Sequence, residues 1–162
     1  MSRNQRIVLM LGVVLVSALV KWHFPVLAQD KSAILHGLQG CCVVVERLEP
    51  EIELGGLTKE QLQTDTEVKL RMAGIKVYSL KEATQVERSR YFYLNVNVIK
   101  LRSGCYEYDI STELIEEAFP LWETTWTQLA VLGRSCRLSD IRRDAEDMVE
   151  MFVNEYLAAN SK

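Results

Sequence analysis

The chain has 162 residues, of which 48% are apolar and 25% are charged, and its formal net charge is −3. This is the composition of a globular domain with a hydrophobic core, and the acidic balance gives it no electrostatic means of binding nucleic acid. We find no low-complexity segment and no internal repeat.

Residues 1–28 have the layout of a secretory signal peptide. Arg3 and Arg6 form a basic start, and residues 7–20 are an apolar run without a charge. This run is shorter than the roughly 20 residues that a membrane-spanning helix needs. We therefore predict cleavage after residue 28. The alternative is an uncleaved anchor, if the apolar span continues past Lys21.

Cleavage would leave a chain of one domain's length, with 16 basic and 22 acidic side chains and a net charge near −6. We predict a loosely ordered lead-in over 29–40 and a single domain over 41–160. The protein would be periplasmic or secreted, with no membrane span after signal cleavage. Its negative charge also disfavours binding to anionic lipid surfaces.

Residues 41–48 predict the first strand, and the unbroken valine run over 43–45 indicates that this strand is covered on both faces. Thr58 then opens a helix, because Gln61 three residues later completes a capping box. Gly74 is a fitting end for that helix.

A short strand is predicted over 75–80, after this helix. Two loops are predicted beside the helix and the strand. Residues 50–56 contain a glycine pair, and residues 81–90 are highly charged.

The strongest local signal is an alternation of apolar and polar residues in two segments that flank Gly104. If Leu101 pairs with Cys105, partner numbers sum to 206 and apolar residues face each other across a hairpin. A two-residue loop would instead place Val98 opposite Asp109. The alternation of apolar and polar residues on the two strands therefore predicts a three-residue loop with Gly104 as its left-handed residue.

Residues 122–132 are rich in Trp, Thr and Val and predict another strand, and residues 135–160 predict an amphipathic helix that Ser139 caps. The apolar stripe of this helix consists of Leu138, Ile141, Ala145, Met148, Phe152 and Tyr156, widened by Val149 and Val153. The order β-α-β-β-β-β-α predicts an α+β fold. We expect an antiparallel-dominated sheet of about five strands with both helices on one face.

The four cysteines of an exported chain are more often bridged than free. Because neighbouring strand residues point to opposite faces, Cys41 and Cys42 are expected to form one bridge on each side of the sheet. Their partners would be Cys105 and Cys136, with the connectivity open. The alternative is a strained, redox-capable bridge between Cys41 and Cys42 themselves.

We predict no metal, no cofactor and no enzyme active site. The sequence has no C-x-x-C spacing, no phosphate-binding glycine loop and no G-x-S-x-G, and His36 is the one histidine after residue 28. Glu107, Asp109 and Glu113 form an acidic row that could support acid–base chemistry. We interpret this row as the solvated face of the sheet.

The candidate binding residues are Tyr93, Asn95, Asn97, Asp109 and Ser111, which share the predicted helix-free face. Aromatic and amide side chains on an exposed surface suit a protein or glycan partner. Other aromatic residues that could extend this surface are Tyr91, Tyr106, Trp122 and Trp126. We predict a non-enzymatic interaction module that binds an envelope or extracellular protein through this face or through a sheet edge.

The alternative function is that of a carrier for a small apolar ligand, held between the sheet and the last helix. Its cavity would be lined by Phe152, Met148, Trp126 and Tyr108. The same residues more often simply fill a core.

The stretches "LRMAGIKV", "LNVNV", a strand rich in Trp and Thr, and "FVNEYLAAN" follow one another in the chain. In this order, over roughly 43–160, the chain resembles a group of small exported bacterial proteins of unknown function. The order of elements is also similar to periplasmic accessory modules such as the N-terminal domain of TolB-like proteins. The likeness implies an accessory or assembly role, and it carries no site residue because none of these stretches is a chemical motif.

Overall fold

The computed structural model describes residues 31–118 and 121–161, so the predicted signal peptide lies outside the described residues. The helices are α2 (Lys31–Leu35), α3 (Pro50–Leu54), α4 (Lys59–Met72), α5 (Leu80–Ala83) and α6 (Leu138–Asn160). The strands are β1 (Gly40–Val45), β2 (Lys76–Tyr78), β3 (Arg90–Lys100), β4 (Tyr106–Ala118) and β5 (Leu121–Ser135). The fold is α+β, as the sequence predicts.

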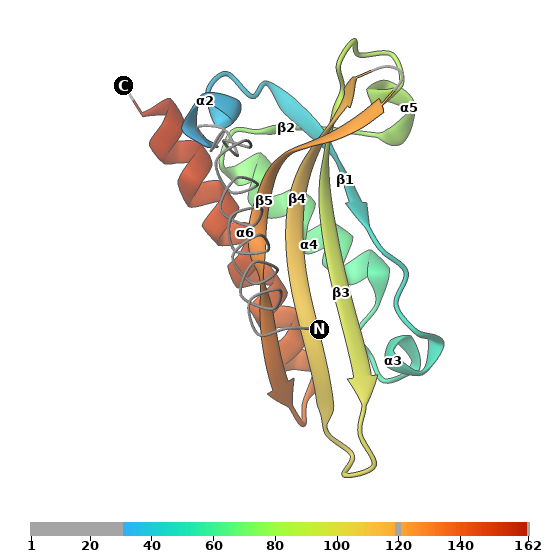
Figure 1. Cartoon of the computed structure of the whole chain (residues 1–162). Helices are drawn as coiled ribbons and strands as arrows, with labels where there is room; N and C mark the ends of the chain where they lie inside the picture. Colours follow the sequence, from blue (N-terminus) through green and yellow to red (C-terminus); the bar gives the residue numbers. More distant parts are fainter. Residues whose placement is uncertain (1–30, 119–120, 162) are drawn as a thin grey trace, which may run out of the picture.

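The strands form one five-stranded sheet in the order β2-β1-β3-β4-β5 (Figure 1). The expectation of an antiparallel-dominated sheet is wrong, because β1 pairs in parallel with both β2 and β3 and the sheet is mixed. The connections explain this pairing. The chain crosses through α4 between β1 and β2, and a strand–helix–strand crossover returns the chain in its original direction.

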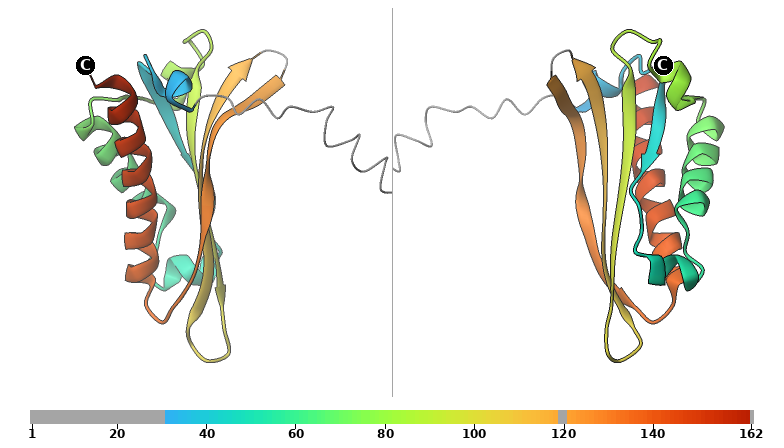
Figure 2. Two further views of the ribbon diagram at one scale, coloured as in Figure 1. Left: turned by 60° about the vertical axis from the view of Figure 1, so that its left-hand side comes forward. Right: turned by 90° about the vertical axis from the view of Figure 1, so that its right-hand side faces the viewer.

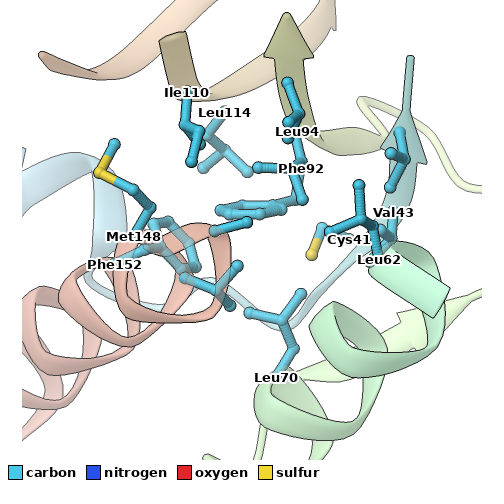
Figure 3. Packing of buried hydrophobic residues seen from close by; sticks show 14 of the residues in the cluster. Cys41, Val43, Leu62, Leu70, Phe92, Leu94, Ile110, Leu114, Met148 and Phe152 are labelled. Carbon is cyan, nitrogen blue, oxygen red and sulfur yellow. The ribbon is translucent and has the colours of Figure 1, made fainter. Parts of the chain in front are cut away.

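Helices α4 and α6 pack side by side on one face of the sheet (Figure 2). The main core lies between these helices and the strands, and Figure 3 shows its centre. The ring of Phe152 from α6 lies 4.7 Å from that of Phe92 and 4.8 Å from that of Trp126, measured between centroids. All three side chains are almost completely buried. This packing fixes the helices and leaves the opposite face of β3, β4 and β5 uncovered by α4 and α6.

Helix α4 begins and ends as the sequence predicts. The Thr58 hydroxyl accepts a hydrogen bond from the Gln61 N–H, and the Gln61 side chain accepts one from the Thr58 N–H, each at 3.2 Å. Gly74 follows the helix with φ of +84°, a left-handed conformation that glycine adopts without steric cost.

The predicted hairpin register is confirmed residue by residue. Val98 pairs with Tyr108 and Asn97 with Asp109, so partner numbers sum to 206 along the whole ladder. The three-residue turn is closed by the Leu101 N–H, which donates to the Cys105 carbonyl at 2.8 Å. Gly104 is left-handed, with φ of +85°.

Two short helices occupy segments that the sequence predicts as loops. Pro50 stands at the start of α3, where its missing N–H costs nothing, and Ser79 forms a capping box with Glu82 at the start of α5. Helices of four or five residues show no apolar periodicity, so only their capping residues could have indicated them.

The lead-in is packed rather than loosely ordered over its described part, residues 31–40. Leu35 and Leu38 are buried in the main core. His36 makes a 3.0 Å hydrogen bond through Nδ1 to the Ala159 carbonyl of α6. The lead-in therefore closes one end of the core.

Helix α6 begins two residues earlier than a Ser139 cap would allow. Its N-cap residue is Arg137, whose side chain caps no backbone group. Ser135, the last residue of β5, links the segment before the helix to the first helical turn, because its hydroxyl accepts from the Arg137 N–H at 3.1 Å and donates to Asp140 at 2.7 Å. The predicted Ser139 cap is wrong because the helix already begins at Leu138, so Ser139 lies within its first turn.

Candidate functional site

The pairing of β3 with β4 brings the five predicted binding residues together on the face that α4 and α6 leave uncovered. Asn95 pairs with Ser111, Asn97 with Asp109, and Tyr93 lies one step further along the same face. All five side chains keep some exposure to solvent, and that of Asn97 is exposed. We call these five residues the open-face patch.

Hydrogen bonds order both ends of the open-face patch. The Tyr93 hydroxyl donates to Glu46 at 2.6 Å, and the amide of Asn97 donates to Asp109 at 3.0 Å. The bond to Glu46, together with burial, raises the pKa of Tyr93 to about 12. Tyr93 is therefore a neutral donor at physiological pH and is held in one orientation.

The centre of the open-face patch contains an unsatisfied acceptor. The side-chain oxygen Oδ1 of Asn95 is buried and has no hydrogen-bond partner among the described residues. Buried polar groups are nearly always paired, because leaving one unpaired costs about 1–3 kcal/mol. Because the oxygen is inaccessible to solvent in this conformation, a donor from another molecule reaches it only if the Asn95 side chain turns outward.

Two apolar side chains that sequence analysis missed stand on the same face. Ile99 and Leu132 are 66% and 81% exposed, near the hairpin end of β3 and β5. The alternation that placed Asn97 on this face also places Ile99 there, so the signal was present. Leu132 could not be assigned, because a bulge in β5 between Gln128 and Val131 reverses the side on which later residues lie.

The acidic row of Glu107, Asp109 and Glu113 on β4 lies on a partly solvated face of the sheet, in agreement with our interpretation of the sequence. Glu107 pairs with Arg134 of β5, and Asp109 accepts from Asn97. Among the described residues, no group of three or more His, Cys, Asp or Glu side chains is placed to hold a metal ion.

The other aromatic candidates do not extend the open-face patch. Trp126 lies in the main core and its indole N–H donates to Glu155 at 2.8 Å. Tyr91 is buried in a small cluster with Cys42 and Ala83. Tyr106 packs against the main core, and the side chain of Trp122 lies outside the described part.

The disulfide joins Cys105 to Cys136, and Cys41 and Cys42 are free thiols. The predicted bridges between the two pairs are therefore wrong. Cys42 pairs with Tyr91 of β3, whereas Cys105 follows the other end of that strand, about 30 Å away at 3.3 Å per residue. The prediction considered only which face of the sheet each cysteine occupies and took no account of this distance along the strand.

The free thiols are separated and shielded. Cys41 points into the main core and Cys42 into the small cluster on the opposite face. Burial raises the pKa of Cys41 to about 12 and raises that of Cys42 as well. Both side chains are protonated at neutral pH, which makes them poor nucleophiles. The adjacent cysteines are packing residues in this structure.

The fold and this face define an α+β domain with a mixed sheet, covered by two long helices on one side and polar on the other. No protein-family model matches the chain, and no curated protein matches it. The resemblance to exported bacterial proteins and to TolB-like modules stays a prediction. In the described part, no helix combines the length and apolarity needed to cross a membrane.

Proposed function

We propose that this protein is a non-enzymatic exported interaction module, which binds an envelope or extracellular protein partner through the open face of its sheet. The observation that carries the proposal is the open-face patch itself, a continuous hydrogen-bonding surface flanked by the exposed side chains of Ile99 and Leu132. An accessory role of this kind agrees with the resemblance described above.

The patch has the composition of a protein-binding surface. Such surfaces combine apolar or aromatic anchors with hydrogen-bonding groups around them. Ile99 and Leu132 supply the anchors, and Tyr93 supplies an aromatic ring. Asn95, whose side-chain oxygen has no hydrogen-bond partner among the described residues, would supply an acceptor if its side chain turned outward on binding.

The disulfide supports a location outside the reducing cytosol. Disulfides persist in oxidising compartments, so the Cys105–Cys136 bridge suggests such a compartment. With the signal peptide predicted over 1–28, we place the protein in the periplasm or outside the cell.

The carrier alternative finds no support between the sheet and α6. Phe152, Met148 and Trp126 are almost fully buried, and they pack against one another and the sheet rather than around a space. Three surface depressions in the described part are lined by other residues.

The test is capture of the partner by cross-linking in the source cells, with variants of the open face. Leu132→Asp and Tyr93→Ala should each reduce the captured partner strongly while the melting temperature changes little. Met72→Asp is the matched control, since Met72 is 83% exposed on α4, away from the open face, and should capture as the wild type does. Equal capture by all three variants would contradict the proposal.

A further inference from the structure

Among the described strands, none covers one edge of β1 along its second half. Strand β2 pairs only with Gly40, Cys41 and Cys42, although β1 continues to Val45. On that side, none of the described strands pairs with residues 43–45. A free edge of this kind presents backbone groups to which another strand can add.

The backbone groups that point to this edge can be identified. The N–H of Glu46 donates to the Leu94 carbonyl of β3 at 3.1 Å. Because successive strand residues turn their backbone groups to alternate sides, Val44 also turns toward β3, and Val43 and Val45 turn toward the free edge.

The free edge forms one wall of a groove with a volume of about 370 Å³. Lys59, Gln63 and Glu67 of α4 form the opposite wall, and they share one side of the helix because they are four residues apart. Tyr78 and Leu80 close the end where β2 stops. The groove therefore continues the line of β2 beside β1.

We propose that an extended segment of the partner protein adds to the sheet in this groove as a further strand beside β1, with an acidic side chain opposite Lys59. This inference rests on the proposed function and names the form in which a partner, or one part of it, is recognised. Hydrogen bonds to the backbone of Val43 and Val45 would provide the binding affinity. Contacts with α4 would determine which side chains the added segment can carry.

The charges of the groove favour an acidic residue at that position. Lys59 makes no ion pair with any described residue, whereas Glu67 is already bonded to Arg71 at 2.7 Å and to Gln63 at 3.0 Å. The available charge of the groove is therefore positive. From Lys59 to Glu67 the helix wall rises through eight residue steps, about 12 Å, which matches about four residues of an added strand.

The test uses the full chain and a fluorescein-labelled synthetic peptide of alternating valine and threonine that carries one glutamate. We expect saturable binding by fluorescence polarisation and shifts of the backbone amide signals of residues 43–46. A peptide of the same sequence with alternate amides N-methylated should lose binding at least tenfold, because it cannot complete the ladder. Equal binding of the two peptides, or no binding at millimolar peptide, overturns the proposal.

Charge reversal separates strand addition from non-specific adsorption. Lys59→Glu should weaken binding of the glutamate peptide about fivefold, the size of a partly exposed ion pair, and a peptide with lysine in place of glutamate should restore it. Unchanged binding overturns the charge assignment of the groove. Leu132→Asp on the open face should bind the peptide normally. If that variant alone loses the peptide, the groove proposal fails and the open-face proposal stands.

Discussion

At the scale of single residues, two tyrosines on opposite faces of the sheet are each bonded to a carboxylate. Tyr93 donates to Glu46 on the open face, and Tyr108 donates to Asp144 of α6 on the helix-covered face. The hydrogen bond to Glu46 raises the pKa of Tyr93 to about 12, and burial followed by the bond to Asp144 does the same for Tyr108. In both cases the hydrogen bond to the carboxylate stabilises the protonated form of the tyrosine.

These two pKa values predict a loss of stability at high pH. The folded protein keeps both protons between pH 10 and about 12, where the unfolded chain releases them, so unfolding becomes easier as pH rises through this range. The contribution is full below about pH 10. Urea unfolding at a series of pH values should show the decline, and Tyr93→Phe combined with Tyr108→Phe should flatten it. An unchanged slope in the double variant would contradict the assignment.

At the scale of elements, the start of α6 is tied to the end of β5 although no side chain caps the helix. Ser135 lies before the helix, yet its hydroxyl bridges the Arg137 N–H and the Asp140 carboxylate. Two bonds to this hydroxyl also lower the freedom of the segment that leads from β5 into the helix. Ser139, which the sequence favoured as the cap, is exposed within the first turn.

A pair of alanine substitutions distinguishes the two serines. Ser135→Ala should lower the free energy of unfolding by about 1 kcal/mol, the usual net contribution of a hydrogen bond, because it removes the hydroxyl that joins the Arg137 N–H to Asp140. Ser139→Ala should change it by less than about 0.5 kcal/mol, as exposed substitutions usually do. Urea denaturation of both variants measures the difference. A larger loss for Ser139→Ala than for Ser135→Ala would contradict the stabilising role assigned to Ser135.

At the scale of the whole molecule, the disulfide and the lead-in close opposite ends of the core. The bridge from Cys105 to Cys136 ties the β3–β4 hairpin to the start of α6, across 31 residues of chain. At the other end, the side chain of Asn160 accepts from the Gly37 N–H and donates to the Leu35 carbonyl, each at 3.0 Å. Both links join segments that are distant in sequence.

Removal of the bridge should destabilise the protein measurably. A disulfide across 31 residues restricts the unfolded chain by about 3–4 kcal/mol, so the double variant Cys105→Ser and Cys136→Ser should lose about that much. Thiol labelling of the wild-type protein, with its disulfide left intact, tests which cysteines are free. Cys41 and Cys42 should react only after denaturation, and a chain with no reactive thiol in denaturant would contradict the observed pairing.

The features predicted correctly from sequence are those set by residues close together in the chain. The cap of α4 needs only Thr58 and Gln61. The hairpin register follows from parity across a three-residue turn, and it was enough to place all five residues of the open-face patch on one face. Short-range hydrogen bonds and side-chain alternation decide these features, so no other part of the molecule has to be known.

Long-range packing decided the rest. The parallel position of β1 depends on the crossover through α4, and the pairing of Cys105 with Cys136 depends on which ends of the sheet meet. The exposure of Leu132 depends on a bulge that only the alignment of β4 with β5 reveals. The sequence by itself determined the α+β class and the patch. The tertiary structure decided the cysteine chemistry and the free edge of β1, because both depend on distances between segments that are remote in the chain.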